Sequence, residues 1–291
     1  MRKQKRTALI VLLAPPLFFM ALFVIFPLVT SGYYSLLEWD GIAEGTFVGL
    51  DNFVEMLRKG KIFAAIFNTL LLLLCSLFVQ FPFAIALAII IASRIRGEGA
   101  FRFIFFLPVV ISTTVVCLVW ERFYNFDYGA LNNALELLGL ETVRRAWLAD
   151  SGTAVWAVIA PAVWQWTGFY ILLFYTGVKS INEELYDSAK IDGATFRQIA
   201  FKITIPLIMP VVKVAVILTT VGSFKIFDYI WIMTKGGPIG LTHVPTTLMY
   251  IRIFEEYSYG RGSAIAVFIV LECVLITAVI RKLFVVEEVT H

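Results

Sequence analysis

The chain has 291 residues, of which 60% are hydrophobic and 15% are charged, and its mean hydropathy is +0.86. In soluble domains about a quarter of the residues are charged. This composition therefore indicates an integral membrane protein and excludes an ordinary soluble domain. The net charge of +3 is too small for a nucleic-acid-binding surface, so no nucleic acid is expected as a partner.

The first spanning helix is expected within residues 8–37, after the basic start MRKQKR. Its apolar run is longer than that of a signal peptide, and no small-residue cleavage site follows before Tyr33, so a retained helix is preferred. Residues 62–284 hold the other apolar runs that are long enough to cross roughly 30 Å of hydrocarbon. These runs are Ile62–Ile91, Phe103–Phe123, Thr153–Val178, Leu207–Met233 and Gly262–Phe284. The predicted fold is therefore all-α and membrane-integral, with six helices in one domain over residues 1–291.

The distribution of charge predicts the orientation of these helices. One side of the membrane would hold both termini, residues 93–102 and residues 179–206. This side contains 13 of the 24 Lys and Arg residues, whereas the other three loops contain 9. Since an excess of Lys and Arg marks the cytoplasmic side, both termini are predicted to be cytoplasmic. In the outer loop 127–152, the amphipathic stretch LNNALELLGL predicts a short helix on the outer face.

The sequence offers little material for a metal or redox site. Cys75, Cys117 and Cys273 lie in apolar runs, which is typical of small core residues rather than of disulfides or metal ligands. His243 and His291 are the only histidines, so no metal is expected. A membrane enzyme is also disfavoured, because no His, Cys or paired carboxylates gather at one depth of the predicted helices.

The longest strongly polar segment is Ser180–Pro206, between the fourth and fifth predicted spans. A Ser-x-x-Glu pattern at Ser180 and a Thr-x-x-Gln pattern at Thr195 are both capping boxes, and Gly193 is typical of a helix end. The segment therefore predicts a helix, a glycine turn and a second short helix. From spacing alone, a solvated loop is the favoured interpretation, and a docking surface for another protein is the alternative.

The predicted faces of these two helices differ in character. Leu185, Ala189 and Ile199 are expected to face the parent protein. The side chains expected to face outwards are Glu184, Asp187, Lys190 and Arg197.

The run EELYDSAKIDGA, followed by Ile205-Pro206, resembles the EAA loop of ABC-importer permeases. That loop usually reads Glu-Ala-Ala, then Asp-Gly-Ala, then an apolar residue with proline. Here Asp187-Ser188 replaces the commoner Glu-Ala, which keeps a carboxylate one methylene shorter. The resemblance implies a coupling helix that docks on a cytoplasmic ATPase. The residues that it assigns to this contact are Glu184, Asp187, Ala189, Asp192, Gly193 and Ala194.

Further motifs resemble the carbohydrate-uptake branch of that family, in particular the MalF/UgpA-like subunits. They are Asn68-Thr69, FRFIFFLP at Phe101–Pro108, Tyr128-Gly129 with Asn132, and FKIFDYIWIMTKGGP at Phe224–Pro238 with Thr242. The resemblance implies a type I importer permease, in which a MetI-like core of five helices, here 62–284, follows an extra N-terminal helix. It also implies a bacterial or archaeal cytoplasmic membrane.

The partners that this resemblance implies are a second, homologous permease subunit, two ABC ATPase subunits and an extracytoplasmic solute-binding protein, besides the sugar and membrane lipid. The chain has no Walker A motif: GRGSA, at Gly260–Ala264, lacks the Gly-Lys-Ser/Thr ending and its spacing. ATP and Mg²⁺ are therefore expected on the partner ATPase, this chain should hold no cofactor, and it should be a transport subunit rather than an enzyme.

Polar residues inside spanning helices mark transport pathways by default. On the fourth span Gln165, Trp166 and Phe169 lie at helical spacing and suit a polyhydroxylated substrate, although an aromatic belt or plain packing also fits the aromatic residues. Lys225 and Asp228 are expected either to pair with each other or to contact the sugar. The family's cavity pattern falls close to Thr113, Gln165, Trp166, Phe169 and Ser223.

The predicted function is ATP-driven import of a carbohydrate, in particular an oligosaccharide, by alternating access. One alternative is a permease for substrates of the glycerol phosphate type, whose anionic group would bind Lys225. Another is an ion-coupled secondary transporter. Glu121 and Glu272 are too few to form the proton relay that a proton-coupled transporter would need, so a packing role is preferred for both.

Overall fold

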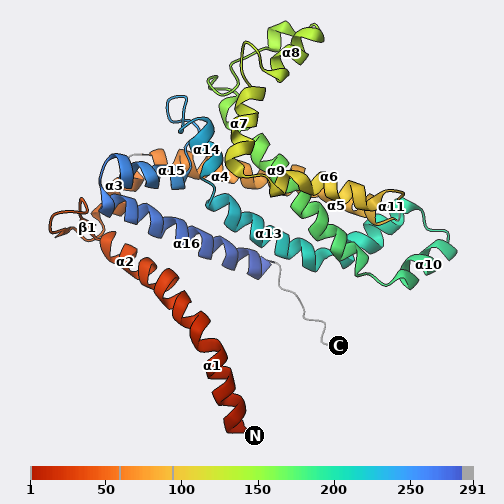
Figure 1. The fold of residues 1–291 in the computed structure, drawn as a ribbon, viewed down its shortest axis with the longest axis horizontal. Helices are drawn as coiled ribbons and strands as arrows, with labels where there is room; N and C mark the ends of the chain where they lie inside the picture. The colour runs from red at the N-terminus through yellow and green to blue at the C-terminus, as the bar shows by residue number, and fades with distance from the viewer. Residues whose placement is uncertain (1, 59, 94, 284–291) are drawn as a thin grey trace. The chain divides into compact units, whose positions relative to one another are not determined.

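The computed structural model describes residues 2–58, 60–93 and 95–283. They group into two compact units, Met1–Phe63 with Leu248–Glu272, and Ala64–Thr247 with Cys273–His291. Nearly all elements are helices, as Figure 1 shows, which confirms the predicted all-α fold. The organisation as one domain stays a prediction.

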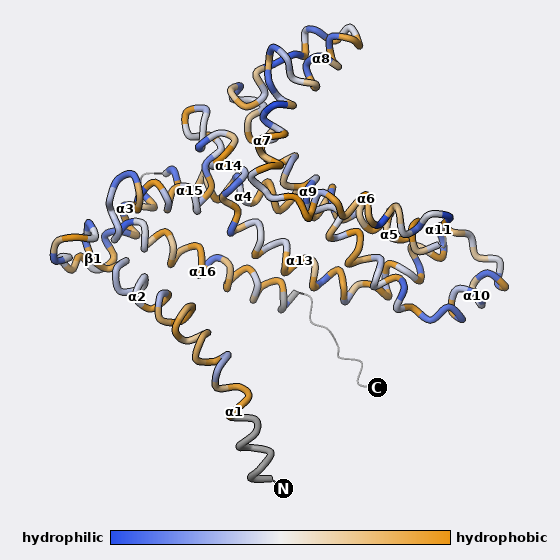
Figure 2. Tube along the Cα trace, viewed as in Figure 1, coloured by the Kyte–Doolittle hydropathy of each residue, from blue (hydrophilic) through white to orange (hydrophobic). Residues whose placement is uncertain are grey.

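The first unit begins with a long apolar helical segment, of which Val11–Tyr34 is long and apolar enough to cross a membrane. Its side chains are exposed over residues 11–28, and the hydropathy colouring of Figure 2 shows how apolar it is. The elements of this unit are α1 (Arg2–Met20), η1 (Ala21–Ile25), α2 (Phe26–Tyr34), β1 (Leu37–Glu38), β2 (Thr46–Phe47), α3 (Asp51–Arg58), η5 (Ile251–Glu255) and the first part of α16 (Tyr259–Leu283).

A buried amide and a close backbone approach hold the first unit together. The Nδ2 of Asn52 on α3 donates to the carbonyl oxygens of Ser35 (2.9 Å) and Leu37 (2.8 Å). The two strands pair antiparallel, with Leu37 opposite Phe47. At Gly260 on α16, a Cβ would lie 1.9 Å from the Leu37 oxygen. Only glycine lets α16 approach the strand this closely.

Within the described residues, five helices are long and apolar enough to span a membrane, or six if the bent pair α6 and α7 counts as one span. The five are Val11–Tyr34, Lys61–Ala92, Ala154–Lys179, Met209–Met233 and Tyr259–Ile280. Phe284, the predicted end of the last span, lies outside the described residues. The elements in these spans after the first are α4 (Lys61–Cys75), η2 (Ser76–Gln80), α5 (Phe81–Ala92), α9 (Ala154–Lys179), α13 (Met209–Phe224), α14 (Asp228–Met233) and α16.

The third predicted span is not one continuous helix. It consists of α6 (Glu98–Val110) and α7 (Thr113–Phe123), which are bent by 94° at the break between them. Ile111 and Ser112 have extended ψ angles of 139° and 135°, and Pro108 in the last turn of α6 lacks an N–H donor. The prediction of a single helix over Phe103–Phe123 is wrong, because apolar composition continues unchanged through a break in the backbone.

Three helices contain a short π-helical stretch just before an X-Pro pair. These stretches are η1 before Pro27, η2 before Pro82, and η4 (Ala200–Thr204) before Pro206. A proline inside a helix leaves the carbonyl four residues earlier without its donor, and its ring collides with that carbonyl. In each case the carbonyl belongs to the middle residue of the π-helical stretch. The widened turn thus accommodates the proline without ending the helix.

Helix α9 is the centre of the second unit, with buried residues along its whole length. Its first half packs with α7 and α14 around Cys117, Val158 and Ile230, and its second half packs with α5 and α13 around Phe81 and Phe174. The loop between α7 and α9 holds α8 (Ala130–Leu137) and the short η3 (Glu141–Val143), so the predicted short helix is confirmed. The connection after α14 ends in α15 (Pro245–Tyr250).

Replacing Gly168 by alanine is expected to destabilise the permease. A Cβ at this position of α9 would lie 1.9 Å from the backbone oxygen of Phe105 on α6, so the two helices would have to separate. Overpacking of this kind costs about 1–3 kcal/mol. Thermal unfolding of the detergent-solubilised protein measures the effect. Gly32→Ala in α2 is the matched control, because its Cβ meets nothing within 4 Å; equal midpoints for the two variants would contradict the close approach.

Candidate substrate cavity and coupling segment

A cavity of about 390 Å³ opens in the second unit between α9, α13 and α14, with α4, η2 and α7 completing its wall. It brings together six of the seven residues predicted to bind substrate, from three different predicted spans. These six are Thr113, Trp166, Phe169, Ser223, Lys225 and Asp228. Their role as substrate contacts stays a prediction, but the structure places them around one space.

Gln165, the seventh predicted residue, is 1% exposed and lies behind the wall of the cavity. Its Nε2 donates to the backbone oxygen of Ile111 (2.8 Å), and its Oε1 accepts from the hydroxyl of Tyr229 (2.6 Å). The amide therefore satisfies the carbonyl at the break between α6 and α7 and ties it to α14. In this structure Gln165 positions the cavity wall and does not reach the cavity.

The aromatic side of the cavity combines an exposed indole with rings held by packing. Trp166 is 44% exposed, and its ring meets that of Phe169 edge to face with centroids 6.1 Å apart. Tyr170 lines the same cavity, and its hydroxyl accepts from Thr219 (2.5 Å). A mostly apolar wall with a few fixed polar groups is the usual character of a small-molecule site.

Gln80, Tyr170 and Phe227 also line this wall, although none of them was among the predicted substrate contacts. Gln80 carried a usable signal, since it is a strongly polar residue in an apolar run. Its Nε2 donates to the backbone oxygen of Val163 (2.7 Å), so it also links η2 to α9.

The predicted ion pair between Lys225 and Asp228 does not form. Both side chains are exposed and line the cavity, and among the described residues no salt bridge joins them. The prediction assumed helical spacing, but α13 ends at Phe224 and α14 begins at Asp228. The break removes the geometry that would bring the two charges together.

The segment between α9 and α13 is a helix, a glycine turn and a helix, as predicted. It consists of α10 (Glu183–Ile191), α11 (Phe196–Ile199), η4 and α12 (Ile205–Leu207). Gly193 has a φ of 75°, which suits glycine. The capping box at Thr195 is confirmed, since Gln198 accepts from the backbone N–H of Thr195 (2.7 Å) and donates its own to the threonine hydroxyl (3.4 Å).

The capping box predicted at Ser180 is wrong. Ser180 ends α9, and its hydroxyl donates to the backbone oxygen of Gly177 (2.7 Å). The N-cap of α10 is Asn182, whose Oδ1 accepts from the backbone N–H of Glu184 (3.1 Å). Asparagine is as good an N-cap as serine, and here it stands directly before the first helical residue.

The faces of α10 and α11 differ from the prediction at one position. Ala189 is buried and Ile199 is half-buried, but Leu185 is 48% exposed. Tyr186 turns inwards instead, with its hydroxyl 3.3 Å from that of Thr204. The charged residues predicted to face outwards are confirmed as exposed. They are Glu184, Asp187, Lys190 and Arg197. In Figure 2, α10 is markedly more hydrophilic than α5 and α6.

Two motifs far apart in the sequence meet at the loop after α14. The Nδ2 of Asn68 on α4 donates to the backbone oxygens of Leu241 (2.6 Å) and His243 (2.9 Å). Within the loop, the Thr242 hydroxyl donates to the Gly237 oxygen (2.8 Å). A Cβ at Gly236 would lie 1.9 Å from the His243 ring, so the Gly-Gly-Pro turn packs against that ring.

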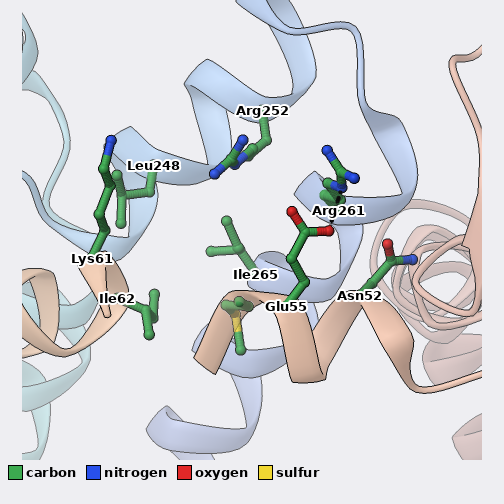
Figure 3. A pocket seen from close by; sticks show the side chains of 9 residues that line it. Asn52, Glu55, Lys61, Ile62, Leu248, Arg252, Arg261 and Ile265 are labelled. Atoms are coloured by element: carbon green, nitrogen blue, oxygen red, sulfur yellow. Dashed lines mark ion pairs between the residues drawn. The ribbon is translucent and has the colours of Figure 1, made fainter. Parts of the chain in front are cut away.

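The first unit contains a separate small cavity of about 40 Å³, shown in Figure 3. Its charged lining residues come from α3, α4, η5 and α16. The Nε of Arg261 lies 2.8 Å from the Oε2 of Glu55, and Arg252 pairs with Glu256. The Arg261–Glu55 pair links α3 to α16, whereas the Arg252–Glu256 pair is local to η5, so the cluster is interpreted as structural.

The comparisons with known proteins agree with this architecture. The family model for the inner membrane component of binding-protein-dependent transport systems matches residues 84–285. The probable ABC transporter permease protein YurN of Bacillus subtilis is 35% identical over 94% of both chains. The trehalose/maltose transport system permease protein MalF of Thermococcus litoralis is 33% identical over 88% of this chain and 86% of its own.

A solved structure shows the same fold. A chain of a bacterial ABC transporter that imports the acidic polysaccharide alginate superposes with a TM-score of 0.84 at 25% identity, over 96% of both chains. The predicted MetI-like importer fold and the resemblance to ABC-importer permeases are thereby confirmed. On this evidence the chain belongs to the family of inner membrane components of binding-protein-dependent transport systems, whose members are multi-pass membrane proteins and components of transport systems rather than catalysts.

Proposed function

We propose that this chain is a permease subunit of an ATP-driven ABC importer that carries a carbohydrate, in particular an oligosaccharide, across the cytoplasmic membrane. The observation that carries the proposal is the cavity between α9, α13 and α14, where Trp166 and Phe169 present aromatic rings beside the polar groups of Thr113 and Ser223. Aromatic rings stack on the apolar faces of sugars, and hydroxyl groups bond to their edges. Carbohydrates are also the substrates named for two similar proteins, the trehalose/maltose permease and the alginate importer.

The proposed assembly contains a second permease subunit, two ATPase subunits that bind ATP and Mg²⁺, and an extracytoplasmic binding protein. For the binding protein, support comes from the alginate transporter, whose structure includes a periplasmic protein bound to an alginate pentasaccharide. The excess of Lys and Arg supports an orientation with both termini in the cytoplasm of a bacterium or archaeon. In this orientation α10 faces the ATPase side.

The proposed coupling contact is the outward surface of α10 and the turn that follows it. Glu184 and Asp187 are exposed there. The apolar residues Leu185 and Ile191 are exposed as well, to 48% and 87%. A surface that mixes exposed charges with exposed apolar side chains is more typical of a protein interface than of a solvated loop. Closure of the ATPase dimer would displace α10, and Gly193 would pass this displacement to α11 and α13.

Reconstitution of the complex in proteoliposomes tests this function. With its binding protein outside and ATP inside, uptake of a labelled oligosaccharide is expected to require ATP hydrolysis. It should fall to background when the Walker A lysine of the partner ATPase is replaced, and an ionophore should leave it unchanged. Uptake that persists with the Walker A variant and is abolished by the ionophore would instead identify an ion-coupled secondary transporter.

An anionic substrate is the alternative that one observation favours. Lys225 is exposed in the cavity without an ion pair to any described residue, so it is available to a phosphate or a uronic carboxylate. The same proteoliposomes decide between the two classes when glycerol phosphate is offered in place of a neutral oligosaccharide.

A further inference from the structure

A second groove, of about 390 Å³, lies in the second unit between α5 and the segment α11 to α12. Every side chain that lines it is apolar except Arg197. The apolar lining residues are Pro82, Ile85, Ala86, Ile89, Ile90, Phe196, Ala200, Phe201 and Ile205. Because α5 belongs to the apolar span Lys61–Ala92, the α5 side of the groove is expected to face the hydrocarbon layer.

Among the described residues, Arg197 is the only charged residue that lines this groove. Lys190 pairs with Asp187 at 2.9 Å, and Lys179 lies 3.9 Å from Glu98. The guanidinium of Arg197 is exposed and makes no hydrogen bond or ion pair with any residue of the described ranges. The surface of the groove is apolar, so Arg197 lines it through the apolar stem of its side chain, and such stems keep the charged head in polar surroundings.

We propose that this groove binds an anionic phospholipid, with an acyl chain along α5 and the headgroup phosphate on Arg197. A guanidinium bonds a phosphate through two parallel N–H groups, which is stronger and more specific than a lysine contact. Basic sites between transmembrane helices at the cytoplasmic side are typical binding sites for anionic headgroups. In the proposed orientation, the lipid belongs to the cytoplasmic leaflet.

The position of the groove gives the lipid a regulatory effect. Ala200, Phe201 and Ile205 belong to η4 and α12, which connect α10 and α11 to α13. A lipid in the groove packs between this connection and α5 and therefore restrains the coupling segment. Anionic lipid is thus expected to raise the ATPase activity that the loaded binding protein stimulates. This effect rests on the proposed function, whereas lipid binding itself does not.

Lipid retention by the purified complex, measured by native mass spectrometry in mixed phosphatidylglycerol and phosphatidylcholine, tests the site directly. The wild type is expected to retain phosphatidylglycerol selectively. Arg197→Gln should bind it about tenfold more weakly, as expected for loss of one charge-assisted contact. Lys202→Gln is the matched control, because Lys202 is an exposed cation on η4 that does not line the groove.

A second variant tests the apolar part of the site without disturbing the core. Ala86 is exposed and lines the groove, so Ala86→Phe should fill it and displace the lipid while Arg197 stays in place. Soluble glycerol phosphate, which has the phosphate but no acyl chain, should not displace phosphatidylglycerol from the wild type. In nanodiscs, the stimulation by phosphatidylglycerol should be lost in Arg197→Gln and in Ala86→Phe.

Three results would overturn the proposal. Equal retention of both lipids by wild type and Arg197→Gln would show that the arginine selects no headgroup. Full displacement by glycerol phosphate would identify a site for a free phosphate. Dissociation of the two permease subunits by Ala86→Phe would show that the partner subunit covers the groove. Sugar uptake is measured separately, so none of these results bears on the transported substrate.

Discussion

Replacing Gly193 by proline is expected to abolish sugar uptake while leaving the permease folded and inserted in the membrane. Gly193 has a φ of 75°, whereas proline is fixed near −65°, so the turn between α10 and α11 has to take another course. The position is exposed and a Cβ there meets nothing within 4 Å, so the core is not affected. Uptake into proteoliposomes and the ATPase activity stimulated by the binding protein measure the loss.

Gly139 provides a matched control for this variant. It has a φ of 73°, also in open space, but it follows α8 in the loop between α7 and α9. Gly139→Pro creates the same backbone conflict away from the coupling segment and should preserve uptake. Glu184→Lys, which reverses a charge on the exposed face of α10, should uncouple transport without changing the turn. Transport at the wild-type level in Gly193→Pro or Glu184→Lys would refute the coupling role of this segment.

Replacing Gln165 by leucine is expected to destabilise the permease and to abolish uptake together. The Ile111 carbonyl and the buried Tyr229 hydroxyl each lose their hydrogen bond to Gln165. An unsatisfied buried polar group costs about 1–3 kcal/mol, so the thermal unfolding midpoint should fall clearly. Uptake should fail as well, because the break between α6 and α7 loses its link to α14.

Trp166→Ala separates this structural role from a substrate contact. Trp166 is the neighbouring residue, but its side chain is 44% exposed in the cavity. Its removal should leave the unfolding midpoint nearly unchanged and raise the sugar concentration that half-saturates uptake. A Tyr229→Phe variant, combined with Gln165→Leu, measures the coupling between the two side chains. If Gln165→Leu kept the wild-type midpoint and altered only the choice of sugar, Gln165 would be a direct contact.

The parts of this fold that depend on local composition could be predicted from the sequence. Long apolar runs locate the spanning helices, and the motif around Gly193 locates the turn in the coupling segment, because each of these features is determined by residues close together in the chain. The break at Ile111 could not be predicted in this way. It is stabilised by Gln165, which lies 54 residues later and donates to the carbonyl that the break exposes.

The candidate site shows the same division. Thr113, Trp166 and Ser223 are polar or aromatic residues in apolar surroundings, so the sequence marks them, and the structure gathers them around one cavity. The pairing of Lys225 with Asp228 depended on helical backbone between them, which the structure does not have. Gln80 carried the same kind of signal as Gln165, and only the fold shows that one lines the cavity and the other lies behind it.

The π-helical stretches before Pro27, Pro82 and Pro206 bear on the lengths of these helices in related sequences. A π turn holds one residue more than the α turn that it replaces, so it is structurally equivalent to a single-residue insertion. Loss of one residue inside such a stretch can be absorbed by conversion to an ordinary α turn. The same deletion elsewhere in the helix would rotate every following side chain by about 100° and turn its buried face outwards. Natural variation in helix length is therefore expected to concentrate at these three places and at η5, the other π-helical stretch among the described residues.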